Sequence, residues 1–134
     1  MNIDTINQLC KEGLIGHLGI EFLEYNENFV TARMPIDKNK LQPTGILHGG
    51  ASLALAETVG SAGSFFIIDP TKFDVLGLQV TANHVSTISS GVLIAKAELI
   101  HKGNLTHVWD VKITDEEGKL ISAARVTNII KEKL

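Results

Sequence analysis

The sequence predicts an α+β fold in which one antiparallel sheet wraps around a single long central helix. Segments rich in β-branched and aromatic residues, separated by short polar turns, occur on both sides of residues 49–66. Residues 49–66 contain one charged side chain and are apolar or small on both faces of a helical wheel, which is typical of a helix enclosed by other elements. The chain of 134 residues has the size of one domain, so we expect residues 1–134 to form a single domain.

The N-terminal segment is predicted to form a short amphipathic helix. Apolar residues recur at helical spacing over residues 4–11, and Asp4 is placed to act as the N-cap. Gly13 and Gly16 follow and are expected to end helical structure.

A strand pair, a loop and the central helix are expected next. Residues 20–25 and 29–36 are rich in strand-forming residues and flank a short polar turn, which predicts an antiparallel pair. Residues 37–45 are polar and turn at Pro43–Gly45, so they are expected to form a loop. The central helix is predicted to open at the following glycine pair and to run to about residue 66.

The C-terminal half is predicted to hold four further strands. Short polar breaks separate the β-rich runs, so we expect them to form an antiparallel meander. In the third run, His107, Trp109, Val111 and Ile113 alternate with more polar residues, which predicts one buried face. The four expected strands cover residues 75–85, 92–100, 105–114 and 120–130.

Charge and cysteine content limit the class of function. The net charge of -3 provides no basic field for nucleic acid, and the acidic residue inside the longest apolar run disfavours a membrane span. Cys10 is the single cysteine, and the first residues lack the pattern of a signal peptide, so we expect a cytoplasmic location. The five histidines show no metal-ligand spacing, so no metal site is expected. His101 and His107 flank a predicted hairpin turn and are expected to be exposed.

Glu57 is the candidate reactive residue, because it is the one carboxylate in an otherwise uncharged helix. A carboxylate in apolar surroundings costs free energy unless it is paired or functional. The alternatives are an ion pair with Arg33 or Arg125, or a position at an open, solvated edge.

The start of the same helix offers groups that could stabilise negative charge. His48 precedes Gly49 and Gly50, and glycines at a helix start allow a ligand to approach free backbone N–H groups. The alternative is a tight turn that packs closely on the sheet. Gln42 lies upstream in the loop and by itself would be read as a surface amide.

These residues together resemble the hotdog-fold acyl-CoA thioesterases. The resemblance rests on the run Gln42-Pro-x-Gly-x-x-His48-Gly-Gly followed by Glu57-x-x-x-Ser61, and it extends over nearly the whole chain. It is to the branch that holds the Arthrobacter-type 4-hydroxybenzoyl-CoA and phenylacetate-pathway thioesterases. Within it, the sequence is most similar to 1,4-dihydroxy-2-naphthoyl-CoA hydrolases and enterobactin-pathway proofreading thioesterases.

The resemblance implies roles for five residues. Glu57 matches the catalytic carboxylate, which acts as a nucleophile or as a general base toward water. Gln42, His48 and the N–H of Gly49 match groups around the thioester carbonyl, and Ser61 matches a hydroxyl that positions the carboxylate or water.

The resemblance also implies where coenzyme A binds and that no further cofactor is used. Ser86 departs from the pattern, because a basic residue stands there in a relative, and this weakens the case for a phosphate contact at this position. The expected partner is an acyl-CoA substrate, and the chain is expected to form at least a homodimer, with a homotetramer of two dimers as the fuller expectation. The implied contacts are Gly77, His84, Val85, Ser86, Thr87, His101, Lys102, Gly103, Asn104, Leu105 and Thr106.

Helix geometry predicts that each active site uses two chains. Gly50 and Glu57 lie about 10.5 Å apart along a helix, whereas a carboxylate and an oxyanion donor must both reach one carbonyl. A two-fold partner would bring the start of one helix near the middle of the other.

Two other functions compete with aryl or aroyl-CoA hydrolysis. A non-catalytic acyl-CoA sensor on the same fold would bind the ligand but would have no use for a glutamate beside Ser61. A hotdog enoyl-CoA hydratase would need a catalytic Asp and His close together on the helix, where this chain has Glu57 with His48 nine residues earlier.

Overall fold

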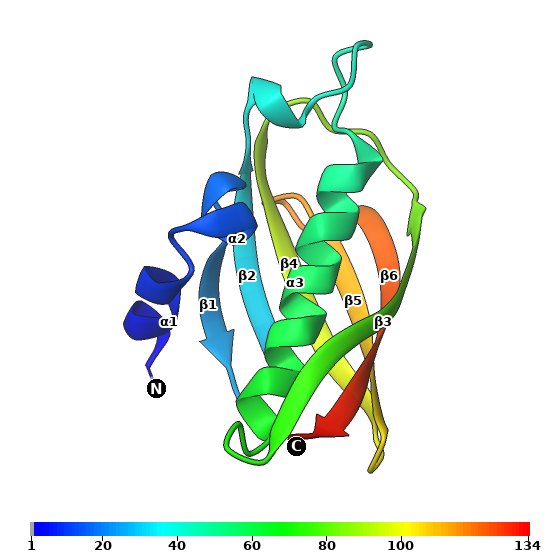
Figure 1. The fold of residues 1–134 in the computed structure, drawn as a ribbon. Coiled ribbons are helices and arrows are strands. Elements are labelled where there is room, and N and C mark those ends of the chain that lie inside the picture. The colour runs from blue at the N-terminus through cyan, green and yellow to red at the C-terminus, as the bar shows by residue number, and fades with distance from the viewer. Residues whose placement is uncertain (1) are drawn as a thin grey trace.

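One six-stranded antiparallel sheet curves around a long helix, as the sequence predicts (Figure 1). The computed structural model describes residues 2–134. The order of strands across the sheet is β1-β2-β4-β5-β6-β3. The elements are α1 (Ile3–Leu9), α2 (Gly13–His17), β1 (Glu21–Tyr25), β2 (Phe29–Ile36), the 3-10 helix η1 (Lys38–Lys40), α3 (Gly49–Ile67), β3 (Phe73–His84), β4 (Gly91–Lys102), β5 (Thr106–Thr114) and β6 (Leu120–Glu132).

The expected meander of the four C-terminal strands is correct for three of them and wrong for β3. β4, β5 and β6 are neighbours in sequence order, but β3 pairs with β6 at the far edge of the sheet. The reason is the position of α3 in the chain. After β2 the chain leaves the sheet, and α3 carries it across the face of the sheet to the far edge (Figure 1). β2 therefore pairs directly with β4, although β3 lies between them in the sequence. Turn residues show where strands end but not which strand lies beside which, so the sequence could not reveal this crossover.

The N-terminal segment differs from the prediction in its cap and in a second helix. Asn2, not Asp4, caps α1, and its side chain accepts a hydrogen bond from Thr5 N at 2.8 Å. Gly13 does not end helical structure but begins α2, with a φ of 81° that favours glycine. Gly16 lies inside α2, where a Cβ would come within 1.7 Å of a backbone oxygen. These glycines allow two short helices to pack closely together. From the sequence alone, the same glycines predict the end of helical structure.

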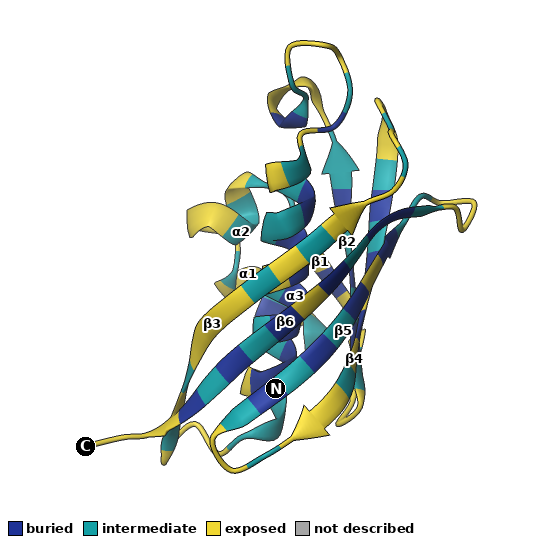
Figure 2. Cartoon of the chain, turned by 90° about the vertical axis from the view of Figure 1, so that its right-hand side faces the viewer, coloured by how far each residue is buried: buried dark blue, intermediate teal, exposed yellow. Residues whose placement is uncertain are grey.

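The alternation in β5 is confirmed. Trp109, Val111 and Ile113 are fully buried, and Figure 2 shows buried and more exposed residues alternating along the neighbouring strands. His107 belongs to the same inward row and is 2% exposed, so the expectation that it is an exposed hairpin residue is wrong. β5 begins at Thr106, and the inward face of the strand therefore already includes residue 107.

Small residues allow α3 to approach the sheet closely. A Cβ at Gly60 would lie 2.8 Å from Val126, and one at Gly63 would lie 2.6 Å from the ring of Trp109. The opposite side of α3 is open in the single chain, because Glu57 is exposed and Phe65 is 48% exposed. The sheet therefore encloses one side of the helix only.

The approach of α3 to the sheet at Gly63 gives a stability prediction. Gly63→Ala should lower the free energy of unfolding by about 1–2 kcal/mol, because overpacking against Trp109 exceeds the gain in helix propensity. Urea unfolding of the two proteins measures the difference. Trp109→Phe provides space at the same point, so Gly63→Ala should cost less in that background. An equal or higher stability of Gly63→Ala alone would contradict the packing argument.

Candidate active site

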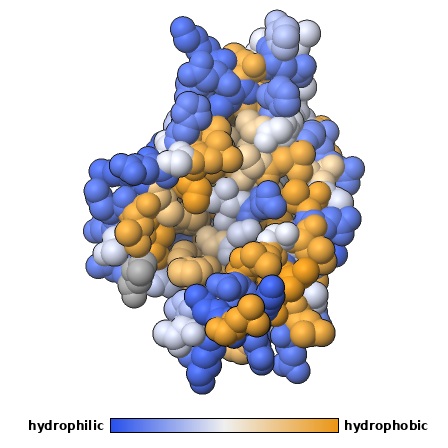
Figure 3. Space-filling model, viewed as in Figure 1, coloured by the Kyte–Doolittle hydropathy of each residue, from blue (hydrophilic) through white to orange (hydrophobic). Residues whose placement is uncertain are grey.

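Glu57 lies at the mouth of an apolar pocket between α3, α1 and β1. The pocket has a volume of about 520 Å³. Figure 3 shows apolar residues gathered around the hollowed middle of this face, over α3 and the N-terminal segment. Among the described residues, Glu57 is the one charged side chain of the lining. The lining residues are Ile6, Leu9, Cys10, Ile15, Phe22, Glu57, Thr58, Ser61, Ala62, Phe65, Phe66 and Val75.

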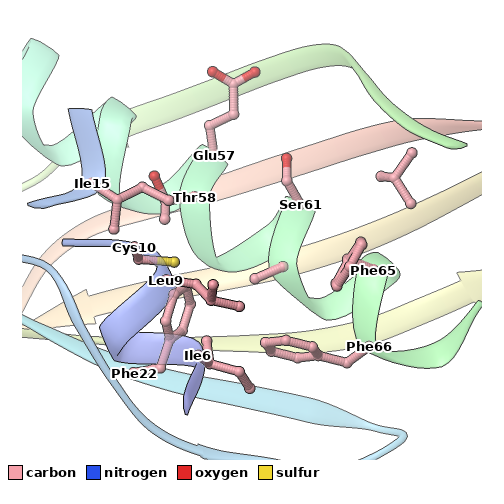
Figure 4. Close-up of a pocket in the computed structure, with 12 residues that line it drawn as sticks. Ile6, Leu9, Cys10, Ile15, Phe22, Glu57, Thr58, Ser61, Phe65 and Phe66 are labelled. Atoms are coloured by element: carbon pink, nitrogen blue, oxygen red, sulfur yellow. The ribbon is translucent and has the colours of Figure 1, made fainter. Parts of the chain in front are cut away.

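The helix period brings Glu57 and Ser61 to the same side of the pocket. They are four residues apart on α3, and residues at this spacing are neighbours on a helix surface. Figure 4 shows both side chains pointing to the same side of α3, with Phe22, Leu9 and Ile6 on the other side of the helix in this view. The hydroxyl of Thr58 donates to Ala54 O at 2.6 Å and is thus satisfied within the helix. Of the three oxygen-bearing side chains in the lining, Glu57 and Ser61 therefore remain to meet a ligand.

The carboxylate of Glu57 has no cationic partner among residues 2–134. Arg33 pairs with Glu21 at 2.8 Å and Arg125 with Asp110 at 3.6 Å, so neither arginine reaches it. Of the alternatives weighed from the sequence, the ion pair is wrong, whereas an open edge describes the single chain correctly. The exposed carboxylate is free to meet a ligand or a second chain.

Gly77 lies directly against this carboxylate. A Cβ at residue 77 would stand 2.9 Å from Glu57 Oε2, so a side chain there would displace the glutamate. The pairing of β3 with β6 shifts register between Gly77 and Gln79, as it does at a β-bulge or a similar irregularity. Bulges are frequent beside active sites, where they redirect a strand locally. Of the residues predicted to contact coenzyme A, Gly77 is thus placed beside Glu57.

The start of α3 presents a histidine cap and an unbonded N–H. His48 is the N-cap, and its Nδ1 accepts a hydrogen bond from Gly50 N at 2.8 Å. The N–H of Gly49, as the first helical residue, has no partner within the helix. The ring of His84 lies close by, since a Cβ at Gly49 would be 2.7 Å from His84 Nε2. His84 itself is held by Ser122 Oγ, 2.7 Å from its Nδ1.

A second pocket of about 540 Å³ surrounds this helix start. Its lining includes Gln42, Gly49 and residues 84–87, so two predicted carbonyl-binding residues lie beside four predicted coenzyme A contacts. The loop that carries Gln42 is fixed by backbone bonds from Gln42 N to Ile46 O and from His48 N to Lys40 O, both at 2.8 Å. The Gln42–Gly45 turn confirms the turn predicted from the sequence.

The predicted site residues are therefore divided between separate places in one chain. The two pockets share no lining residue, although both border α3. Residues 101–106 cover the end of β4, the turn that follows and the first residue of β5, at the opposite end of the sheet from residues 84–87 (Figure 1). Within a single chain, the structure does not bring Glu57, Gln42 and both predicted coenzyme A segments together.

Sequence reasoning missed the residues that form the walls of the Glu57 pocket. Phe22 and Phe66 meet edge to face with ring centroids 6.0 Å apart, and the ring centroids of Tyr25 and Phe66 are 4.3 Å apart. Cys10 also lines the pocket, and burial raises the pKa of its thiol, so the group stays protonated near neutral pH. The apolar face of the first helix was visible in the sequence, but nothing showed that it would pack over residues 57–66.

Residues 2–134 contain no group of three or more His, Cys, Asp or Glu side chains that could hold a metal ion. Of the helices in this described part, none is sufficiently long and apolar to cross a membrane.

Comparison with known sequences places the chain among thioesterases. Residues 44–122 match the family model described as the thioesterase superfamily. A 1,4-dihydroxy-2-naphthoyl-CoA hydrolase from Listeria monocytogenes is 39% identical over 90% of this chain and 98% of its own. The proofreading thioesterase EntH from Cronobacter turicensis is 32% identical over 97% of this chain and 94% of its own. Both groups expected from the sequence are thus among its relatives.

Solved structures agree with the fold. Thioesterase PA1618 from Pseudomonas aeruginosa, in a form with one glutamine replaced by alanine, superimposes with a TM-score of 0.95 at 37% identity and covers 99% of this chain and 96% of its own. Protein SAV0944 from Staphylococcus aureus has a TM-score of 0.88 at 42% identity and covers 90% of this chain and 100% of its own. SAV0944 was solved with a glutamate and, separately, with a glutamine replaced by alanine.

Proposed function

Because this chain belongs to the thioesterase superfamily and is a thioester hydrolase, we propose that it hydrolyses acyl-CoA thioesters with aryl or aroyl groups, using Glu57. The observation that carries the proposal is the position of Glu57 and Ser61 at the mouth of a pocket that is otherwise apolar. In SAV0944, the replaced glutamine and glutamate lie the same number of positions apart as Gln42 and Glu57 do here, which supports the two assignments.

The reaction follows one of two routes from the same carboxylate. Glu57 takes a proton from water, whose oxygen adds to the thioester carbonyl carbon, or the carboxylate adds itself and water hydrolyses the resulting anhydride. In the first route the C–S bond of the resulting adduct breaks, so that the acid and the coenzyme A thiolate are released together. In the second route the C–S bond breaks and the thiolate leaves as the anhydride forms, and water then releases the acid from Glu57. Because such a thiolate has a conjugate acid with a pKa of about 8.5, no strong general acid is required.

The start of α3 is proposed to stabilise the oxyanion. The N–H of Gly49 has no partner within the helix and lies at the positive end of the helix dipole. Gln42 lines the same pocket and supplies a second donor. His48 is proposed to act mainly as a cap here, since its Nδ1 is occupied by Gly50 N.

We propose that each site combines Glu57 and Ser61 of one chain with Gln42 and Gly49 of its partner. In the single chain these residues line separate pockets, and the Glu57 side of α3 is exposed and largely apolar. A homodimer with two equivalent sites would join the two halves, and pairs of dimers would form the expected tetramer. A cytoplasmic location is part of the same proposal.

The aromatic walls of the pocket favour a flat acyl group. Gly60 and Ser64 face the sheet and are buried, so they provide no room for the acyl group. The space instead lies among Phe22, Phe65 and Phe66, and rings stack favourably against such walls.

Benzoyl-CoA should exceed acetyl-CoA in kcat/KM by more than tenfold, because binding energy from the ring can be used in the transition state. Release of free thiol measures both rates. Hexanoyl-CoA is the matched control for size, and it should be hydrolysed less efficiently than benzoyl-CoA. Equal efficiencies for benzoyl-CoA and acetyl-CoA would reject the aryl preference, and binding of all esters without hydrolysis would favour the sensor.

A further inference from the structure

A buried hydrogen-bond network lies between α3 and the strands β5 and β6. Ser64 and Asn128 are fully buried, and His107 is nearly so. Ser64 Oγ lies 2.8 Å from Trp109 Nε1, 2.9 Å from Asn128 Nδ2 and 2.9 Å from His107 Nδ1. The network joins α3 to β5 and β6.

The donors and acceptors of this network can be assigned from Ser64. The Trp109 indole and the Asn128 amide nitrogen only donate, so they occupy both lone pairs of the Ser64 oxygen. The Ser64 proton is left for His107 Nδ1, and the ring then carries its own proton on Nε2. Burial, Lys102 and His101 lower the pKa of His107, which agrees with a neutral ring.

The amide orientation of Asn128 is fixed in the same way. Its Nδ2 also donates to Gly60 O at 3.1 Å. If the amide were flipped, its oxygen would face Gly60 O and Ser64 Oγ. Gly60 O is a carbonyl oxygen, which only accepts hydrogen bonds, so it could not donate to the amide oxygen. The Asn128 Oδ1 must therefore face the remaining neighbour, Ser61, whose hydroxyl donates to it at 3.5 Å.

This contact determines which part of Ser61 faces the pocket. With its proton directed to Asn128, the Ser61 oxygen has only lone pairs left to offer a ligand in the pocket that it lines, and it can serve there as an acceptor. A water molecule has two O–H groups, and Glu57 and Ser61 then offer two acceptors for them. Without Asn128, the Ser61 hydroxyl could donate to the carboxylate one helical turn away, and such charge-assisted bonds are strong.

We propose that Asn128 is a positioning residue for hydrolysis, which holds Ser61 as the acceptor for the water that Glu57 activates. The inference rests on the proposed function of Glu57 in the general-base form. Strand pairing supports it, because Asn128 is the register partner of Gly77 on β3 and of His107 on β5. Gly77 lies beside the carboxylate, so Asn128 is paired in the sheet with a residue next to Glu57.

The test is a double-mutant cycle between Asn128 and Ser61. Asn128→Ala should lower kcat for an acyl-CoA ester about tenfold and leave KM within twofold, because an oriented hydrogen bond is lost in the reacting complex. In the Ser61→Ala background, the same change should have no further effect on kcat. An unchanged kcat, or effects that multiply, would overturn the proposal.

Ser64→Ala is the matched control for a purely structural role. It removes three hydrogen bonds of the network but leaves the bond from Asn128 to Gly60 and the contact with Ser61. It should therefore reduce stability in urea at least as much as Asn128→Ala, with kcat within about threefold of the parent. If Ser64→Ala loses as much activity as Asn128→Ala, the network acts through stability and the proposal is wrong.

Two further measurements keep the test decisive. If Asn128→Ala does not fold, Asn128→Leu fills the volume without an acceptor and repeats the cycle. If neither folds, the side-chain amide signals of Asn128 in the parent should shift in Ser61→Ala, and unchanged signals would refute the contact. Parent protein and Glu57→Gln are assayed alongside: no hydrolysis by the parent, or full activity of Glu57→Gln, contradicts the proposed function itself and not Asn128 alone.

Discussion

Glu57→Gln should retain the fold and bind acyl-CoA esters, but its kcat should fall by at least about 100-fold. The amide has the shape of the carboxylate but is neither a base nor a nucleophile. Because Glu57 is exposed and makes no ion pair in the described chain, the change should leave the urea midpoint nearly unaltered. Steady-state kinetics and unfolding curves on the same preparations measure both effects.

The matched control for this variant is Glu116→Gln, which changes the same group on an exposed turn far along the chain. It should hydrolyse acyl-CoA at the parent rate. A Glu57→Gln enzyme that turns over within a few-fold of the parent would remove Glu57 from the reaction.

A mixture of Glu57→Ala and Gln42→Ala protein, unfolded and refolded together, should recover activity that neither has alone. Random association makes about half of the dimers hybrids, and each hybrid has one intact site and one with both changes, so about a quarter of all sites recover. The physical reason is that Glu57 and Gln42 line separate pockets in one chain. Hybrid formation is counted by native mass spectrometry.

The control mixture pairs Glu57→Ala with Ser61→Ala. Both residues line the same pocket, so every site of a hybrid carries one of the two changes and activity should not exceed the average of the separate proteins. If the Glu57 and Gln42 mixture also stays at its average while hybrids are present, each site belongs to one chain.

Local patterns predicted most of the fold. The strand alternation in β5 and the glycine pair at the start of α3 predicted the bounds of those elements within a few residues, because these signals depend on side chains near in sequence. The position of β3 at the far edge could not be predicted in this way, since it follows from the crossing of α3 over the whole sheet. The helix that begins at Gly13 was missed because glycine usually marks a break.

The candidate site was predictable to a smaller degree. Glu57 could be identified in the sequence because a lone carboxylate in an apolar helix costs free energy unless it is paired or functional. Its placement beside Ser61 follows from helix geometry. Asn128 gave no such signal, because it is one polar residue in a strand and its partners Gly60 and Ser64 are more than 60 positions away. Contacts of that range depend on strand register, which the sequence does not specify locally.

Trp109 gives this protein an intrinsic optical probe of its own packing. It is the single tryptophan of the chain, it is fully buried, and both its ring and its indole N–H meet α3, at Gly63 and Ser64. Indole emission moves to longer wavelength when the ring enters water, so fluorescence will report the separation of helix from sheet without any label. A time course of that emission can therefore show whether α3 leaves the sheet before the strands separate.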